Sequence, residues 1–188
     1  MINKKIKFKE ISIADAKIIL KWRRKKRISD YQYTNINSSL KLQKKWILDS
    51  YKKQNYYHWL ILFKKKPIGF ICIKDLDLRK KETDWAFYIG SEDHLTLGSF
   101  LPPFFYNWVF KKFKINKINS FVFASNKNII KIHKYHGYKA LKKFTIIKNK
   151  KKIKCIKMIL LKRKWDTNKY LNYFSDFPIL KWDRQDHK

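Results

Sequence analysis

Two adjacent prolines stand at the head of an aromatic, apolar run in "HLTLGSFLPPFFYNWVF", residues 94–110. Proline lacks a backbone N–H and clashes with the carbonyl one helical turn earlier, so a helix tolerates it only in its first turn. The pair therefore predicts a helix over 98–113, with Gly98 or Ser99 as its cap. The N–H groups at such a helix start lack intrahelical partners and favour an anion. The alternative is a helix start that binds only water.

The rest of the chain supplies enough apolar material for one domain with a buried core. Of its 188 residues, 45% are hydrophobic and 17% are aromatic, which suits a domain of this length. It contains no apolar run long enough to cross a membrane, and its N-terminus lacks the apolar block of a signal peptide. We therefore expect a soluble, cytoplasmic protein. Cys72 and Cys155 are isolated in apolar surroundings, which predicts reduced core thiols and no metal site.

The formal charge is +32, from 46 Lys and Arg against 14 Asp and Glu. Such an excess is typical of proteins that bind nucleic acid or an anionic membrane. The lysines are spread over every segment, however, which favours a solvated surface of biased composition. Dense runs at 21–27 and 148–154 are the places where a polyanion could still bind.

Hydrophobic periodicity predicts an α/β (α+β) fold with one strand, two helices, three strands, a helix, a strand, a helix and two strands. Asn126 can cap the last helix, and Gly137 can end it. The domain is expected to span 1–165, with an aromatic C-terminal extension over 166–188. The expected strands are 5–11, 56–63, 68–76, 83–90, 118–125, 140–149 and 151–165, and the expected helices are 12–26, 37–53, 98–113 and 126–138.

This element order, with an anion-binding loop between the fourth strand and the third helix, resembles the GCN5-related N-acetyltransferase (GNAT) superfamily. The most specific stretch is "NKNIIKIHKYHGY", residues 126–138, which is similar to the superfamily's Asn-x-x-Ala-Ile-x-Leu-Tyr-x-x-x-Gly-Phe motif. The matching positions are Asn126, Ile130, Ile132, Gly137 and Tyr138. The resemblance implies a mixed, mostly antiparallel sheet of about seven strands with a splay between the fourth and fifth, and about four flanking helices.

The phosphate-binding loop departs from the superfamily's Arg/Gln-x-x-Gly-x-Gly/Ala pattern. When Gly98 is aligned with the last glycine, Thr96 takes the place of the first glycine and Asp93 that of the basic residue. Backbone N–H groups hold the pyrophosphate in such loops, so Thr96 is compatible with binding. Asp93 opposes an anion, while the positive field of the whole chain favours one.

Within the superfamily, the chain resembles acetyltransferases that modify the free amine of a UDP-linked amino-deoxy sugar in pseudaminic acid synthesis. The succession "PIG…DLD…WAFYIG" over 67–90 carries this likeness. The resemblance implies transfer of acetyl from acetyl-CoA to a primary amine, with a sugar nucleotide as acceptor. Two alternatives remain open: an acetyltransferase for protein N-termini, or a basic RNA- or membrane-associated protein with a degenerate site. A monomer or a homodimer is expected.

The resemblance also implies site residues. His133 takes the place of the tyrosine that gives a proton to the coenzyme A sulfur, and Asp84, or second to it Glu82, would serve as base toward the amine. The alternatives are a half-buried helical histidine and a solvated strand start. The implied coenzyme A-binding residues, mostly through backbone amides, are Tyr88, Ile89, Thr96, Leu97, Gly98, Ser99, Phe100 and Asn126.

Overall fold

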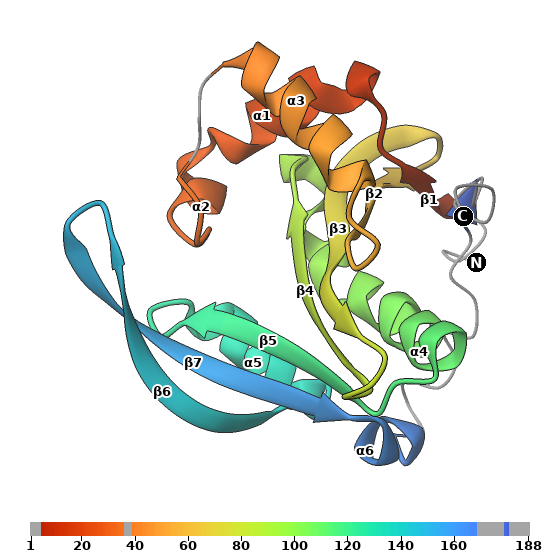
Figure 1. The fold of residues 1–188 in the computed structure, drawn as a ribbon, viewed down its shortest axis with the longest axis vertical. Helices are drawn as coiled ribbons and strands as arrows, with labels where there is room; N and C mark the ends of the chain where they lie inside the picture. The colour runs from red at the N-terminus through yellow and green to blue at the C-terminus, as the bar shows by residue number, and fades with distance from the viewer. Residues whose placement is uncertain (1–4, 36–38, 169–178, 181–188) are drawn as a thin grey trace.

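The structure, a computed structural model, describes residues 5–35 and 39–168 and the backbone of 179–180 (Figure 1). The elements follow the predicted order, with two 3₁₀-helices (η), two short α-helices and the two-residue strand β8 added. In chain order they are β1 Ile6–Glu10, η2 Ile13–Asp15, α1 Ala16–Arg23, α2 Lys26–Ser29, α3 Leu40–Tyr51, β2 Tyr57–Phe63, β3 Lys66–Asp77, β4 Glu82–Ile89, η3 Glu92–Ser99, α4 Leu101–Phe113, β5 Lys117–Phe123, α5 Lys127–Tyr135, β6 Lys139–Lys148, β7 Lys151–Leu161, α6 Lys162–Asp166 and β8 Ile179–Leu180.

The strands form one mixed sheet in the order β6-β7-β5-β4-β3-β2-β1-β8. Neighbouring strands run antiparallel except at two places, β4 beside β5 and β1 beside the two-residue β8. The seven long strands confirm the predicted sheet. In Figure 1 the half made of β5, β6 and β7 swings away from the half made of β1 to β4.

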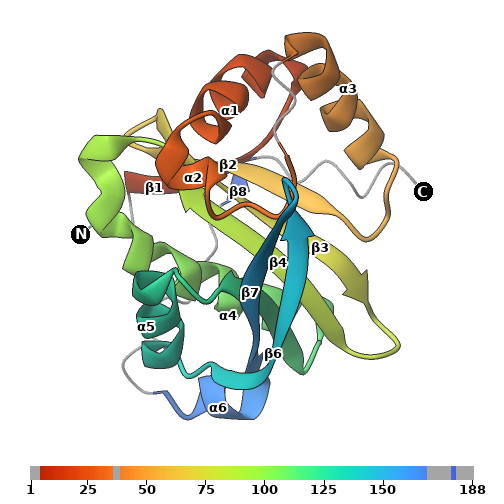
Figure 2. The same cartoon turned by 90° about the vertical axis from the view of Figure 1, so that its left-hand side faces the viewer.

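Helices cover both faces of the sheet, α1 and α3 on one and α4 and α5 on the other (Figures 1 and 2). Because successive strand residues point to opposite faces, each strand feeds two cores. The larger core, on the α4 side, includes Trp59, Trp85 and Phe105. The smaller, on the α1 side, includes Trp22 and Ile47.

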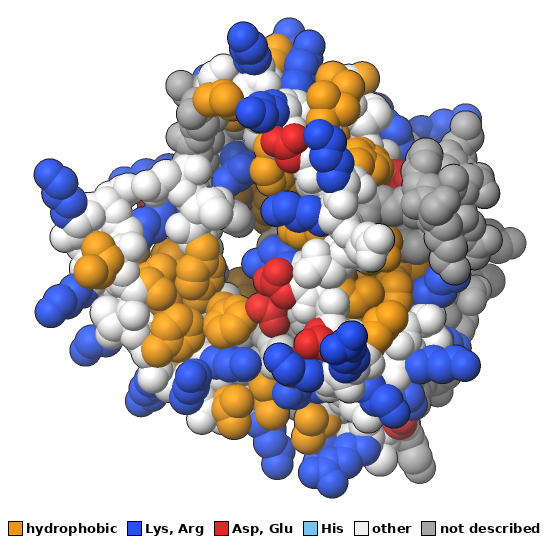
Figure 3. All heavy atoms as spheres, in the orientation of Figure 1, with side chains coloured by type: hydrophobic (Ala, Val, Ile, Leu, Met, Phe, Trp, Pro, Cys, Tyr) orange, Lys and Arg blue, Asp and Glu red, His pale blue; other side chains and the backbone are white. Residues whose placement is uncertain are grey.

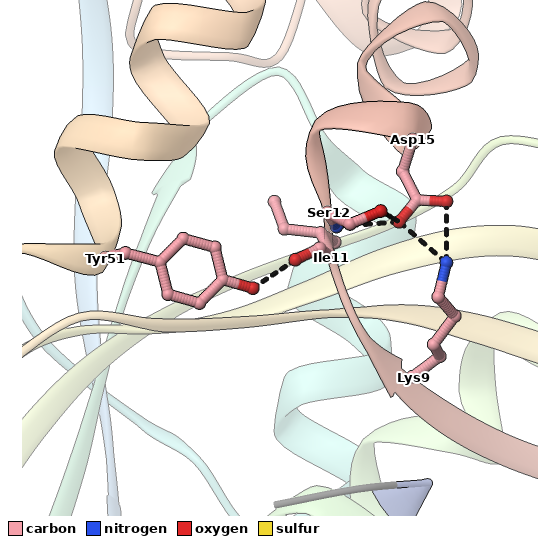
Figure 4. Close-up of polar contacts among 5 residues, drawn as sticks. All are labelled: Lys9, Ile11, Ser12, Asp15 and Tyr51. Atoms are coloured by element: carbon pink, nitrogen blue, oxygen red, sulfur yellow. Dashed lines mark hydrogen bonds and ion pairs between the residues drawn. The ribbon is translucent and has the colours of Figure 1, made fainter. Parts of the chain in front are cut away.

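Polar contacts tie β1 to the helices that follow it (Figure 4). The Lys9 ammonium donates to both carboxylate oxygens of Asp15, at 2.9 and 2.8 Å. The Ser12 amide donates to the same carboxylate at 2.8 Å, and the Tyr51 hydroxyl of α3 donates to the carbonyl of Ile11. These contacts fix where the chain leaves the sheet.

The single helix predicted over 12–26 is wrong in detail, because the chain there forms η2, α1 and α2. The Asp15 side chain binds the Ser12 amide and so competes with regular helical bonding at the start. Lys25 then has an extended backbone, φ −65° and ψ 127°, between α1 and α2. This turn brings α2 against the end of β4.

The prediction that the two prolines head a helix is confirmed, but the predicted cap is wrong. Pro102 and Pro103 lie in the first turn of α4, and the residue before that helix is Phe100. Proline cannot donate back to the carbonyls of residues 98 and 99, so the α-helix cannot extend to Gly98. The preceding stretch takes the tighter 3₁₀ form as η3.

The extension predicted over 166–188 is described only in part. The backbone of β8 pairs in parallel with β1, Phe8 opposite Ile179. Residues 169–178 and 181–188 lie outside the described residues. In the part of the chain that the structure describes, no helix is long and apolar enough to cross a membrane.

Gly90, directly after β4, has no room for a side chain. A Cβ there would lie 2.1 Å from the indole of Trp22, whereas a Cβ on Gly98 would meet only Ile89, at 3.7 Å. We predict that Gly90→Ala displaces Trp22 and lowers the free energy of unfolding by about 1–3 kcal/mol, the usual cost of overpacking. Gly98→Ala is the matched control and should leave stability near wild type. Urea denaturation of both variants tests this, and equal midpoints would contradict the packing described.

Candidate active site

The parallel pairing of β4 and β5 covers only three residue pairs and ends where Asp84 lies opposite Asn119. Beyond that pair β4 continues to Ile89 along β3, and β5 continues to Phe123 along β7. Each strand therefore has one edge without a strand partner in the described chain (Figure 1). These edges present N–H and C=O groups that an extended ligand can bind. We call the space between residues 85–89 and 120–123 the parting; it matches the predicted splay.

The two amides predicted to face the thioester lie on opposite edges of β4. The Gly90 amide donates to Ile68 on β3 at 2.7 Å. Because N–H groups alternate between the edges of a strand, the Ile89 amide faces the parting and the Tyr88 amide faces β3. The Ile89 amide is therefore the one placed to bind an extended ligand in the parting, while the coenzyme A contacts of Tyr88 and Ile89 both stay predictions.

Arg27 of α2 holds the end of β4. Its guanidinium donates to the carbonyls of Ile89 at 2.8 Å and Gly90 at 2.7 Å. Glu92 lies 3.8 Å from Arg27 and accepts a hydrogen bond from Lys25 at 2.7 Å. Sequence reasoning noted this basic run only as a possible polyanion contact, because the partners are more than sixty residues away.

The two predicted base candidates differ sharply. Glu82 forms an ion pair with Lys117, and that hydrogen bond lowers its pKa. Burial raises the pKa of Asp84, although the Lys74 ammonium and an Asn119 hydrogen bond act in the opposite direction. Glu82 is thus held as a paired carboxylate, while Asp84 has the greater affinity for a proton.

Aromatic rings and lysines line the sheet face on which Asp84 lies. Tyr33 packs edge-on against Phe121 and Phe123, with ring centroids 6.3 and 5.1 Å apart. Lys157 and Lys148 place their ammonium groups over the same two phenylalanine rings, at 5.4 and 5.8 Å. We call this surface the inner face.

The molecule is hollowed beside the inner face. Figure 3 shows the hollow between the β6–β7 hairpin, where hydrophobic side chains gather, and the acidic side chains over β3 and β4. At the hairpin tip a cavity of about 390 Å³ is lined by Ser29, Asp30, Thr34, Asn35, Lys148 and Asn149. The inner face is therefore open to an acceptor molecule.

His133 of α5 lies against β5 on the α5 side of the sheet, and it is 5% exposed. Its ring stacks on Trp85 and Tyr138, and its Nε2 lies 2.7 Å from the Ser120 hydroxyl. Burial, with a smaller contribution from the nearby charge of His136, lowers its pKa to about 3. Burial therefore disfavours the imidazolium that the predicted acid role requires at neutral pH.

The loop before α4 uses some of its own donors. The Phe100 amide donates to the Leu97 carbonyl at 3.0 Å, so it is not free, contrary to the prediction. The 3₁₀ turns of η3, which include Thr96 and Ser99, likewise close through backbone N–H groups. His136 Nε2 donates to the Ser99 carbonyl at 3.0 Å. A phosphate bound here would replace bonds within the loop.

Asn126 caps α5, since its side chain accepts a hydrogen bond from the Ile129 amide at 3.3 Å. That confirms the predicted cap. A contact of Asn126 with coenzyme A stays a prediction, as do those of Thr96, Leu97, Gly98 and Ser99. In the described residues no cluster of His, Cys, Asp and Glu could hold a metal ion.

Acid should destabilise the protein through its buried imidazoles. Burial lowers the pKa of His133 to about 3 and that of His136 to about 4, from 6.5. As the pH falls, the two imidazoles become protonated in the unfolded chain before they do in the folded protein. The free energy of unfolding therefore decreases from pH 6.5 down toward the two lowered pKa values. We predict a falling melting temperature over that range, with a shallower slope in His133→Phe. His94→Phe, at a partly exposed site outside this cluster, is the control. Equal slopes in all three proteins would contradict the assignment.

Comparisons with known proteins agree with this geometry. A family model described as an acetyltransferase (GNAT) domain matches residues 5–139. No curated protein sequence matches the chain.

Solved structures share the fold at low sequence identity. A spermidine N-acetyltransferase from Vibrio cholerae in complex with CoA and spermine has a TM-score of 0.80 at 12% identity, covering 87% of this chain and 99% of that one. A dodecameric form of the Vibrio cholerae enzyme has a TM-score of 0.74 at 12% identity, covering 88% and 98%. A protein described as a probable acetyltransferase gives 0.72 at 16%, covering 88% and 97%.

The family match covers most of the described chain, and the parting lies between β4 and β5, where the resemblance placed the splay. The chain belongs to the GNAT acetyltransferases, enzymes that use acetyl-CoA.

Proposed function

We propose that the protein transfers acetyl from acetyl-CoA to a primary amine on an anionic, ring-bearing acceptor of the nucleotide-linked amino-deoxy sugar type. The observation that carries the proposal is the place of Asp84. Its partly buried carboxylate lies at the head of the parting, on the inner face with its lysines and aromatic rings. Amine, thioester and anion would thus be held within one cleft.

The chain offers groups that fit acetyl-CoA. The outward amide of Ile89 can bind a carbonyl or amide oxygen in the parting. The loop amides from Thr96 to Ser99 can bind a pyrophosphate if they exchange their internal bonds. Acetyl-CoA supplies the activated acetyl group, and backbone N–H groups directed at its carbonyl would stabilise the charge that develops on oxygen.

Asp84 is the proposed base. An amine must lose its extra proton before it can attack a thioester, and a carboxylate with a raised pKa accepts that proton better than an ordinary one. Burial is what raises the pKa of Asp84. The carboxylate would act directly or through one water molecule.

Charge on the inner face favours an anionic acceptor. Lys157 lies over Phe121, and its charge lowers the pKa of Asp84, so it acts on the same region as the base. A phosphate can pair with Lys157 while a ring stacks on the neighbouring aromatic side chains. The structural neighbour was solved with spermine. We expect such a polycation to bind less well here than an anionic acceptor, because Lys74 and Lys157 act on Asp84 and the chain carries a formal charge of +32.

Asp84→Asn should lower turnover without lowering the stability of the fold. We predict a loss of turnover of about 100-fold or more, as for removal of a general base. Because folding raises the pKa of Asp84, the unfolded chain loses this proton at a lower pH than the folded protein does. The free energy of unfolding therefore falls as the pH rises between the two pKa values, and the loss persists at higher pH. The melting temperature at neutral pH should therefore hold or rise. Kinetics and thermal denaturation test both parts.

Asp75→Asn is the matched control. The charge of Asp75 raises the pKa of Asp84, so this variant should keep turnover and move the acid limb of the pH–rate profile to lower pH. Wild-type turnover in Asp84→Asn would remove the base assignment.

The acceptor is tested by thiol release from acetyl-CoA with a UDP-linked amino sugar, spermidine and a peptide with a free N-terminus. We predict that the amino sugar is preferred and that Lys157→Glu raises its KM by about 10-fold or more, the worth of a charge-assisted contact. Lys154→Glu, an exposed position on the opposite face of β7, is the control for net charge. A preference for spermidine or for the peptide would refute the proposed acceptor.

A further inference from the structure

Ser120 occupies a special position in β5. It is the first residue after the last β4–β5 pair, so it lies where the two strands begin to separate. Alternation along β5 places it on the α5 side with Ile118 and Val122, and it is 6% exposed. A serine there puts a hydroxyl into an otherwise apolar wall of the parting.

His133 is the hydrogen-bond partner of this hydroxyl. Its Nε2 lies 2.7 Å from Ser120 Oγ, and its ring plane is fixed by stacking on Tyr138 at 4.5 Å and on Trp85 at 5.8 Å. Both side chains are buried. The hydroxyl is therefore held in one place by a rigid neighbour.

The tautomer of His133 decides which way the serine proton points. Its Nδ1 is buried and has no hydrogen-bond partner among the described residues. A proton on Nδ1 would be a buried donor without an acceptor, which is rarer than an acceptor without a donor. The neutral ring therefore carries its proton on Nε2 and donates to Ser120 Oγ. The serine O–H is then free to donate elsewhere.

Other hydroxyl and amide groups at the head of the parting are already engaged. The Thr83 hydroxyl lies 3.0 Å from the carbonyls of Lys74 and Asp84. The Asn119 side chain hydrogen-bonds the acidic residues on the opposite face. On the α5 side of these two strands, Ser120 is thus the described hydroxyl without a carbonyl acceptor; the Tyr106 and Tyr138 hydroxyls belong to the surrounding core.

We propose that Ser120 is a catalytic residue that donates a hydrogen bond to the departing sulfur of acetyl-CoA, and that His133 is the positioning residue that orients it. This rests on the acetyl transfer proposed above. As the N–C bond forms and the C–S bond breaks, the electron pair leaves on sulfur. Asp84 takes the first proton, from the ammonium; the nitrogen loses a second proton as the amide forms, and sulfur finally takes that one, so Ser120 keeps its own.

The first test needs no acceptor. Coenzyme A is bound to the protein, and the pKa of its thiol is measured from the ultraviolet absorbance of the thiolate. Loss of a hydrogen bond to the charged form should raise that pKa by about one unit in Ser120→Ala. Ser120→Thr keeps the hydroxyl and should stay near wild type. An unchanged thiol pKa in Ser120→Ala would overturn the proposal.

The second test is kinetic. Ser120→Ala should lower kcat about 10- to 100-fold, with the KM values for acetyl-CoA and for the acceptor unchanged. Ser125→Ala, in the exposed turn after β5, is the control. Thermal denaturation shows beforehand that each variant is folded, and Ser120→Thr should restore most of the turnover.

His133→Phe tests the positioning role. Phenylalanine keeps the stacking on Trp85 but removes the donor to Ser120. We expect part of the Ser120→Ala loss, and no further loss in the double variant, because both changes disable one unit. Independent, additive losses would overturn the pairing. If the wild type rejects every acceptor in the panel, the proposed acceptor fails, while the thiol pKa still decides the role of Ser120.

Discussion

The parallel pairing of β4 with β5 stops after three residue pairs, and the proposed chemistry depends on that interruption. A continuous ladder would satisfy every strand edge and leave no backbone donor for a ligand. Because the strands part after Asp84 and Asn119, Ser120 lies at the head of the parting and the Ile89 amide faces its far end. The base candidate and the sulfur-side donor thus come from neighbouring positions on two strands and lie on opposite faces of the sheet.

Contacts from α2 and the segment after it keep the two halves of the sheet in place. Arg27 binds the last carbonyls of β4, and the Lys148 ammonium at the β6–β7 hairpin donates to the Ser29 carbonyl at 2.8 Å. The same short segment thus contacts both sides of the parting. Tyr33 follows it and packs on β5. This segment therefore links the two halves of the sheet at the far end of the parting.

Desolvation sets the protonation states around the parting. It raises the pKa of Asp84 and lowers those of His133 and His136, because burial disfavours the charged form of every group. A carboxylate becomes a better base by this effect, and a buried imidazolium is disfavoured at neutral pH. The position of His133 in the helical motif suggested a proton donor, whereas its burial makes it a neutral partner of Ser120.

The sequence determined much of the fold. The paired prolines placed the start of α4, the Asn126-to-Gly137 spacing placed α5, and alternating apolar residues placed all seven long strands. The resemblance also ranked Asp84 ahead of Glu82 as the candidate base. These features depend on neighbours a few residues apart, which a sequence displays directly.

Tertiary structure alone decided which groups meet. Arg27 reaches Ile89 across more than sixty residues, Ser120 meets His133 across a strand and a turn, and the Phe100 amide is taken by its own loop. Burial, and with it the shifted pKa values of Asp84, His133 and His136, exists only once the two cores close around the sheet. A sequence carries the residue types and their spacing, but hydrogen-bond partners and desolvation depend on distances in space.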